Sequence, residues 1–256
     1  KRRKSIKGTT LSFADDMGAE LLHCGAEIRR VEETMELILK SYGYDKCSVS
    51  ATHVNIVATV SEKDGEPLTK TMRIKGKDTN LHRLELLNAL SRKICETKPD
   101  ISVARKELEN IRKEKGSGLL AETIAFAAVG LSYSLSLGGS IGDMLTALFS
   151  AAITRIILFF LEKQRFNNFF TSIIASALIA VITSLSSLFG FCSHSDIAMT
   201  GALITLVPGI ALTNCMRDFM SEDYLSGISG LSEAILTASG IAIGVAVVFF
   251  AKGALI

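Results

Sequence analysis

The feature that constrains the fold most is a series of five long apolar segments in the second half of the chain. A helix that crosses a membrane needs about 20 mostly apolar residues, because each residue rises about 1.5 Å across a hydrocarbon core about 30 Å thick. A soluble helical bundle is excluded, since successive helices that are apolar on every face would leave no polar surface for water. The sequence therefore predicts an α-helical integral membrane protein with about five transmembrane helices, at residues 119–137, 141–161, 169–189, 197–216 and 228–251.

Charged residues are concentrated in the first half of the chain. Residues 1–117 hold 23 of the 28 Lys and Arg residues and 18 of the 26 Asp and Glu residues. We therefore expect a soluble domain at 1–117 and a transmembrane domain at 118–256. The basic excess favours contact with anionic membrane lipid. The run Lys1-Arg2-Arg3-Lys4 also resembles a nucleic-acid-binding tail, but charge beside a membrane explains it without a nucleic-acid partner.

The loops between the predicted spans indicate the orientation. Lys163 and Arg165 lie between the second and third spans and Arg217 lies between the fourth and fifth, whereas the loops at 138–140 and 190–196 contain neither Lys nor Arg. Basic loops stay on the cytoplasmic side of a membrane. We therefore expect a multi-pass protein of the cell membrane whose N-terminus is cytoplasmic.

The soluble domain is predicted to be α+β, and it begins with a helix. Apolar residues recur at alternating steps of three and four from Ala14 to Tyr42, which is typical of one amphipathic helix. Ser12 and Asp15 resemble a capping box at its start, and Gly43 ends the pattern.

Strands and two further helices complete this domain. The β-branched residues of 47–60, the turn signal Asp64-Gly65 and the alternation of 68–74 indicate strands. Helices are then predicted at about 80–96 and 102–115.

His23, Glu27 and Arg30 would share one strip of the first helix, at the spacing i, i+4 and i+7. A His and a Glu one turn apart can be two metal ligands, but no third or fourth ligand stands at metal-site spacing. We interpret the strip as a structural polar network and expect no metal and no cofactor.

The fourth predicted span contains the most informative string. Pro208 removes a backbone donor and Gly209 permits non-helical dihedral angles, so the pair should kink or interrupt the helix. Broken helices form the solute sites of many transporters, although a simple structural kink is the alternative. Hydrogen-bonding groups follow at Thr213 and Asn214, and charges follow at Arg217 and Asp218.

Other charges fall within the predicted spans. Asp143 and Glu122 lie at helix starts and Arg155 lies about two turns from a boundary, so solvation or snorkelling explains them as well as function does. Glu233 lies inside the last span, where its carboxylate could take up a proton during transport. Stabilisation of a helix start is its alternative explanation.

Enzymatic motifs are missing from the sequence. It contains no phosphate-binding loop, no GxSxG motif and no nucleotide fingerprint, so an ATP-driven pump is not supported. A membrane-bound hydrolase that uses His23 and Glu27 ranks well below the other hypotheses. We expect the protein not to be an enzyme.

Two strings resemble a known family. They are Leu22-His23-Cys24-Gly25-Ala26-Glu27-Ile28-Arg29-Arg30-Val31-Glu32, and Val207-Pro208-Gly209 continued through Asn214, Arg217-Asp218, Ser226-Gly227 and Glu233-Ala234. Together they resemble the threonine/serine exporter family over nearly the whole chain. In one place the chain differs, because Ser221-Glu222-Asp223 stands where the family often has a Gly followed by an acidic residue.

The resemblance implies a cytoplasmic domain followed either by ten spans or, in a split form, by five spans that act beside a smaller membrane subunit. This chain resembles the larger component of the split form. The family implies secondary export of a small carboxylate-bearing solute, namely threonine or serine in fused members and succinate or a similar dicarboxylate in a split one.

The leading hypothesis is therefore an exporter component driven by the proton motive force, assembled with itself or with the smaller subunit. Pro208 and Gly209 would shape the substrate site, Thr213 and Asn214 would hydrogen-bond the solute, and Arg217 would attract its carboxylate. Asp218 or Glu233 would carry the proton, and His23, Gly25, Glu27 and Arg30 form the motif of the soluble domain. The alternative is a membrane-anchored regulatory or scaffolding subunit whose soluble domain binds a ligand or partner.

Overall fold

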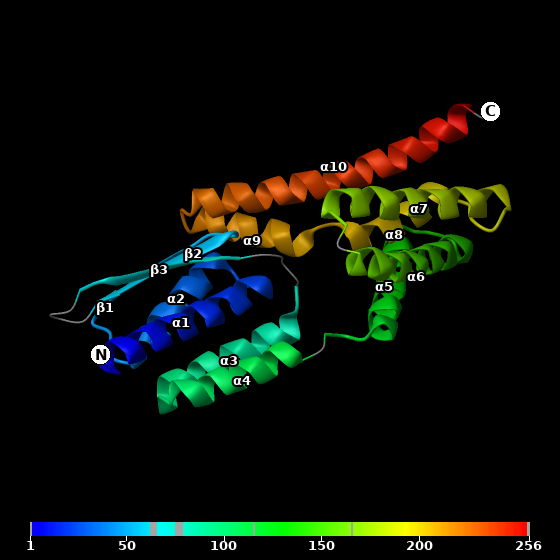
Figure 1. Cartoon of the computed structure of the whole chain (residues 1–256). Coiled ribbons are helices and arrows are strands. Elements are labelled where there is room, and N and C mark those ends of the chain that lie inside the picture. Colours follow the sequence, from blue (N-terminus) through cyan, green and yellow to red (C-terminus); the bar gives the residue numbers. More distant parts are fainter. Residues whose placement is uncertain (1, 62–65, 75–78, 115, 165, 255–256) are drawn as a thin grey trace. The chain divides into compact units, whose positions relative to one another are not determined.

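The computed structural model describes residues 2–61, 66–74, 79–114, 116–164 and 166–254. The chain divides into two compact units (Figure 1). The first unit comprises Lys1–Gly116 and Asn214–Gly230, and the second comprises Ser117–Thr213 and Leu231–Ile256. The predicted turn at Asp64-Gly65 and the loop residue Arg165 lie outside the described residues.

The first unit combines helices with a small antiparallel sheet. Strands β1, β2 and β3 lie in that order, with Cys47 opposite Val60 and Ile56 opposite Met72. Helices α1 and α2 pack on the sheet, and α3 lies along α4 (Figure 1). The α+β character of this part of the chain is thus present. Its elements are α1 (Arg2–His23), α2 (Ile28–Ser41), β1 (Lys46–Ala51), β2 (Asn55–Ser61), β3 (Leu68–Arg73), α3 (Leu81–Thr97) and α4 (Ile101–Lys113).

A single core stabilises the first unit. Alternate residues of β2 are buried, because successive strand residues point to opposite faces and α1 covers one of these faces. The apolar faces of α1 and α2 pack against the buried face of the sheet. Core side chains that are at most 1% exposed include Phe13, Met17, Val31, Met35, Ile56 and Ile94.

The prediction of one helix from Ala14 to Tyr42 is wrong. The helix is divided at Gly25, whose φ of +89° is a conformation that favours glycine. The Ala26 N–H donates to the Leu21 carbonyl (2.9 Å) and the Gly25 N–H donates to the Leu22 carbonyl (3.1 Å). These two bonds form a Schellman motif, which ends a helix at a left-handed residue. The apolar spacing continues across the turn and so conceals it.

Two smaller predictions fail for related reasons. His23 is the last residue of α1 and Glu27 is the N-cap of α2, so His23, Glu27 and Arg30 do not share one helical strip. The helix α1 starts at Arg2, so Ser12 and Asp15 are interior residues and form no capping box.

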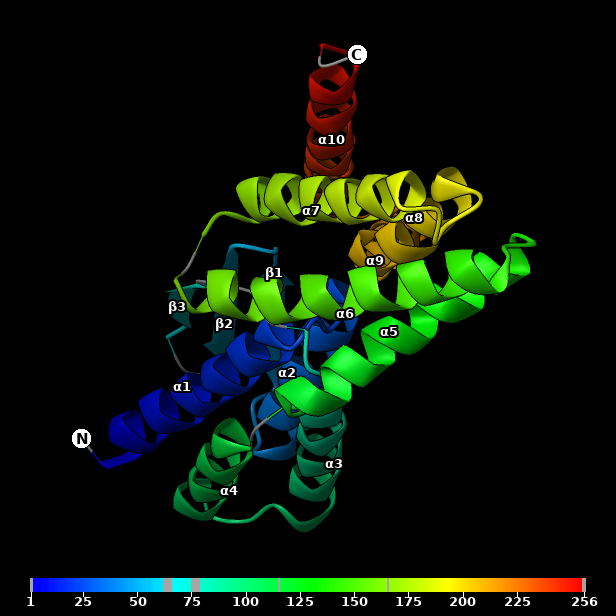
Figure 2. The same ribbon diagram turned by 90° about the vertical axis from the view of Figure 1, so that its right-hand side faces the viewer.

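The second unit contains long apolar helices, and Figure 2 shows α6 between α5 and α7. Four helices of the described chain are long and apolar enough to cross a membrane, or five if a bent pair counts as one span. This agrees with the predicted number of spans. The elements are α5 (Leu119–Ser136), α6 (Ile141–Lys163), α7 (Asn168–Leu188), α8 (Ser195–Leu203), η1 (Ile204–Leu206), α9 (Gly209–Met220) and α10 (Tyr224–Ala254), of which α9 and α10 pass from one unit to the other.

Glycine permits close helix contacts in the second unit. A Cβ atom on Gly244 would overlap Ser176 Oγ and the Ile173 carbonyl, so α10 approaches α7 with no room for a side chain. A Cβ on Gly240 would lie 2.9 Å from the Phe169 carbonyl. The Gly240 to Gly244 spacing therefore serves helix packing, as small residues do in membranes.

Candidate functional site

The predicted site residues divide between the two units. Pro208, Gly209, Thr213 and Glu233 belong to the second unit. The remaining ones, which are His23, Gly25, Glu27, Arg30, Asn214, Arg217 and Asp218, all belong to the first unit. Each group is therefore described within its own unit.

The predicted interruption of the fourth span is confirmed. Val207 adopts extended angles (φ −66°, ψ 129°), because a residue before proline is excluded from the helical region. The helix resumes when the Leu212 N–H donates to the Pro208 carbonyl (3.0 Å). The helix direction bends by 58° between the segments Ser195–Leu206 and Gly209–Met220.

Thr213 uses its hydroxyl within α9. The hydroxyl donates to the Gly209 carbonyl at 2.9 Å, and the side chain is exposed. A solute acceptor that binds Thr213 would have to replace this carbonyl, whereas a solute donor could bind the lone pairs of the hydroxyl oxygen. The hydrogen-bonding groups that the broken segment presents to a solute are thus the backbone after Pro208 and the hydroxyl of Thr213.

In the first unit the two sequence motifs meet, although about 190 positions separate them. Asn214 Nδ2 donates to the Gly25 carbonyl at 3.3 Å. Arg217 Nη1 donates to Glu27 Oε2 at 2.9 Å. We call Gly25, Glu27, Asn214 and Arg217 the motif cluster. The turn at Gly25 makes it possible, because it ends α1 and places Glu27 at the start of α2.

Asp218 lies next to this cluster and is buried, with 2% of its surface exposed. His53 Nε2 lies 3.9 Å from Asp218 Oδ2. A Cβ on Gly230 would lie 3.0 Å from Cys215 Cβ and 3.5 Å from His53 Nε2, so the start of α10 fits closely here. Sequence reasoning missed His53, which stands in the turn between β1 and β2 and belongs to neither motif.

His23 and Arg30 do not join the cluster. Within the described residues, neither has a hydrogen bond or ion pair with Asn214 or Arg217. Arg30 is exposed on the first turn of α2. His23 Nδ1 is buried, and the described part of the chain provides no hydrogen-bond partner for it.

Three charges of the second unit, those of Glu122, Arg155 and Glu162, are paired with one another. Arg155 Nε donates to Glu122 Oε2 at 2.9 Å and Nη1 donates to Glu162 Oε1 at 2.9 Å. The guanidinium carbon also lies 5.7 Å from the centre of the Phe126 ring. Arg155 is thus neutralised within the unit.

Asp143 is fully buried at the start of α6. It accepts the N–H of Ser140 (2.8 Å), the N–H of His194 (2.9 Å) and the thiol of Cys192 (3.1 Å). Together with the Ser140 hydroxyl it forms a capping box. The carboxylate therefore fastens the loop between α7 and α8 to α6, which is a structural role.

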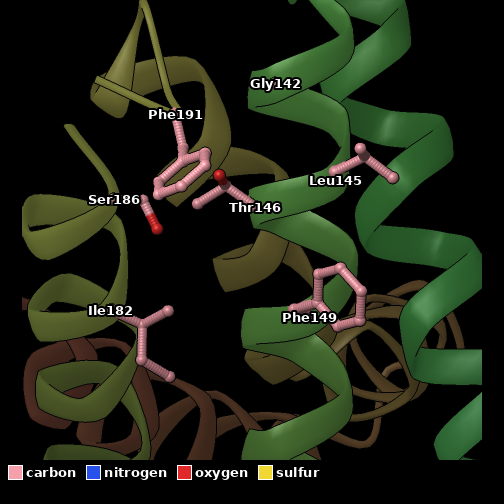
Figure 3. A pocket seen from close by; sticks show the side chains of 7 residues that line it. All are labelled: Gly142, Leu145, Thr146, Phe149, Ile182, Ser186 and Phe191. Atoms are coloured by element: carbon pink, nitrogen blue, oxygen red, sulfur yellow. The ribbon is translucent and has the colours of Figure 1, made fainter. Parts of the chain in front are cut away.

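A cavity of about 250 Å³ lies beside this loop (Figure 3). Phe191 lies beside the hydroxyls of Thr146 and Ser186, and Phe149 and Ile182 line the opposite part (Figure 3). The lining contains no charged side chain. It therefore offers no cation to a carboxylate.

Glu233 is half-buried in α10, and its carbonyl accepts the Thr237 hydroxyl at 3.0 Å. Among the residues that the structure describes, no group of three His, Cys, Asp or Glu side chains is placed to hold a metal ion. The geometry thus concentrates polar chemistry in the motif cluster and at the break before Pro208.

The long apolar helices are typical of a multi-pass membrane protein. Residues 12–251 match the family described as "Putative threonine/serine exporter", and the chain belongs to this family. The resemblance predicted from the two motifs is confirmed. Membership of a transporter family supports a transport role rather than an enzymatic one.

One relative is a Klebsiella aerogenes protein named "Probable succinate transporter subunit YjjP". The two proteins are 24% identical over 233 residues, which cover 88% of this chain and 87% of the relative. No solved structure matches the chain.

Proposed function

We propose that this chain is the larger component of a two-component secondary exporter for small carboxylate-bearing solutes. The single observation that carries the proposal is the interrupted fourth span at Pro208. A non-helical backbone within a membrane is tolerated where it lines a cavity or is buried in protein. The exporter family and the relative's name support the same function.

The solute site is proposed to lie at α9. The N-terminus of a helix carries partial positive charge, so the first turn after Pro208 and Gly209 favours a carboxylate. Thr213 and Asn214 would hydrogen-bond the solute, and Arg217 would attract its charge. Arg217 binds Glu27 through Nη1, so a solute carboxylate can use the remaining N–H donors of the guanidinium or replace Glu27. Replacement of Glu27 would release the start of α2 from α9.

Proton coupling is assigned to Asp218 and Glu233. Asp218 faces His53, and Glu233 lies on α10. A proton taken up on either carboxylate removes a negative charge near the helices that form the site. This would link solute release to the proton motive force.

The solute class spans threonine or serine and succinate or a similar dicarboxylate. The first pair corresponds to the family description and the second to the relative's name. We place the protein in the cell membrane with its N-terminal domain in the cytoplasm. A smaller membrane subunit, or a second copy of this chain, would supply the rest of the transporter.

Uptake into inside-out membrane vesicles tests this function. Vesicles from cells that express the chain with its partner should accumulate labelled L-threonine, L-serine or succinate when energised, and a protonophore should abolish the uptake. The Pro208→Ala and Arg217→Ala proteins should lose uptake. Arg105→Ala serves as a matched control, because Arg105 pairs with Asp16 in the first unit, outside the proposed site. Unchanged uptake by both site variants would remove the site assignment.

A regulatory or scaffolding subunit is the second candidate. It is favoured by the motif cluster, in which Asn214 and Arg217 bind Gly25 and Glu27 of the N-terminal domain. Reconstitution separates the two functions. A purified complex that moves none of the three solutes, while its soluble domain binds a cytosolic ligand, would establish the scaffold.

A further inference from the structure

A polar cavity of about 420 Å³ lies within the first unit, and the proposed transport site does not use it. Arg29 and Glu32 come from α2, Ser50 comes from the end of β1, and Ser221, Glu222 and Asp223 come from the turn between α9 and α10. Cavities that bind small molecules have volumes of about 300–1,000 Å³ and a few convergent polar groups. We propose that this cavity binds a small solute that carries an ammonium group beside a carboxylate.

The charge of the lining selects the ligand. The lining residues include three that carry a carboxylate, Glu32, Glu222 and Asp223, and one that carries a guanidinium, Arg29. This lining has a formal charge of −2, so it repels a dianion and attracts a group with positive charge. Burial raises the pKa of the Glu32 carboxyl, and the negative charge of Asp223 adds to the rise. An ammonium group between the carboxylates of Glu32 and Asp223 would compensate their negative charge.

Hydrogen bonds hold both carboxylates in place. Glu32 Oε1 accepts the Ala51 N–H at 2.7 Å, and Asp223 Oδ1 accepts the Ser226 N–H at 3.2 Å. Within the described residues no hydrogen bond is found to the second oxygen of either carboxylate, so each can accept one from a ligand. An ammonium group has three N–H donors and can bind both oxygens at once.

Arg29 can hold the other end of the ligand. Its Nε bonds Glu33 Oε1 at 3.0 Å, and the guanidinium has further N–H donors at its terminal nitrogens. Arginine binds carboxylates well because its planar fork matches their geometry. The hydroxyls of Ser50 and Ser221 line the same cavity and fit a polar side chain.

A metal ion fits this lining less well. The described residues include no group of three His, Cys, Asp or Glu side chains that could hold one. A free inorganic cation would also leave Arg29 without a ligand group to bind. The combination of one guanidinium with carboxylates is complementary to a zwitterion.

This inference goes beyond the proposed transport function, because none of the residues of the proposed transport site lines the cavity. Isothermal titration of the purified full chain in detergent tests it, with L-serine, succinate and Mg²⁺ as separate probes. In the Arg217→Ala protein, which lacks the cation of the proposed transport site, L-serine should bind saturably, whereas succinate and Mg²⁺ should give no saturable heat. Saturable succinate or Mg²⁺ binding that is lost in the Glu32→Gln protein would overturn the proposal.

The variants Glu32→Gln and Asp223→Asn should weaken L-serine binding about tenfold or more, because each removes a charged acceptor. Both keep the oxygen that accepts the backbone N–H, and Asn is as good a helix cap as Asp, so both should fold. Glu36→Gln is the matched control on α2, since Glu36 pairs with Lys40 and does not line the cavity. Its affinity for L-serine should be unchanged.

The transport-site variants distinguish this cavity from the proposed transport site. In the Arg217→Ala protein, which lacks the cation of the proposed transport site, saturable L-serine binding should remain, and it should be lost when Glu32→Gln is added. L-Serine binding that is lost in Arg217→Ala but kept in Glu32→Gln would assign the heat to the transport site and refute the cavity. Absence of any L-serine binding to the folded chain would refute it as well.

Discussion

Charged side chains are held differently in the two units. In the second unit Arg155 has a side chain only 11% exposed and binds two carboxylates, and Asp143 is fully buried with several donors. In the first unit Arg217 is 54% exposed and binds the single carboxylate of Glu27. A buried, fully compensated charge is costly to disturb and acts as structure. The Glu27 side chain is 9% exposed, but a half-exposed cation costs less to move than a buried one, so Arg217 is better suited to a working cycle than Arg155.

The largest effect is expected from Arg155→Ala. This change leaves Glu122 and Glu162 without their cation, and because these carboxylates are 30% and 54% exposed the cost should lie below the about 3–5 kcal/mol of a fully buried pair. We expect little monodisperse protein after detergent extraction, measured by size-exclusion chromatography. Arg155→Lys keeps the charge and should recover much of the yield. A normal yield of Arg155→Ala would show that the second unit is less tightly compensated than its geometry indicates.

Asp143→Ala should have the next largest effect. It leaves the N–H groups of Ser140 and His194 without their acceptor, and each unsatisfied buried group costs about 1–3 kcal/mol. The loop should loosen and expose Cys192.

The thiol of Cys192 reports this loosening. Burial, and secondarily the Asp143 carboxylate, raises the pKa of Cys192 to about 11. Only the thiolate reacts, so maleimide labelling of the unchanged protein should be slow at pH 8 and faster as the pH approaches 11. In Asp143→Ala the pKa should fall and labelling at pH 8 should accelerate about tenfold or more, as measured by peptide mass spectrometry. The exposed Asp196 provides the control, and equal rates in Asp143→Ala and Asp196→Ala would contradict the structural role.

Asp15 tests whether the first unit also contains a carboxylate that burial makes costly to ionise. Burial raises its pKa to about 6, although Lys70 Nζ lies 3.2 Å from Asp15 Oδ2 and lowers it. The folded state therefore binds this proton more tightly than the unfolded state does. The free energy of unfolding should fall as pH rises from about 4 to 6.

Asp15→Asn should remove this pH dependence. The variant should be more stable than the unchanged protein at pH 7.5, by about 1–2 kcal/mol after allowance for solvent screening, and equally stable at pH 4. Thermal melting at both pH values measures this, with the Asp16→Asn protein as control. A variant that is destabilised at pH 7.5 would mean that the bond to Lys70 outweighs the cost of burial.

Sequence patterns predicted these elements to different degrees. The spans follow from apolar length alone, and the break follows from Pro208, whose effect on Val207 is local. The sequence pattern did not reveal the division of the first helix at Gly25, because apolar residues continue at steps of three and four across the turn. The meeting of Glu27 with Arg217 depends on tertiary packing over about 190 positions, and no local pattern encodes it.

Exchanging the charges of Glu27 and Arg217 should have the smallest effect on stability. It is also the sharpest test of the difference between the two units. Glu27→Arg and Arg217→Glu, each alone, place like charges together, whereas the double variant restores an ion pair of opposite polarity. The Glu27 side chain is only 9% exposed and stands at the N-cap of α2, where a cation opposes the helix dipole, so the double variant should melt above either single variant but below the unchanged protein.

Transport should respond differently from stability. A solute carboxylate needs a cation at position 217 under the proposed function, so the double variant should lose uptake about tenfold or more although its ion pair is intact. The exchange of Arg29 with Glu33, an exposed pair four residues apart on α2, is the matched control and should leave uptake unchanged. If the double variant instead regains both stability and uptake, the pair serves only to join α2 and α9, and Arg217 would resemble Arg155 in function despite its exposure.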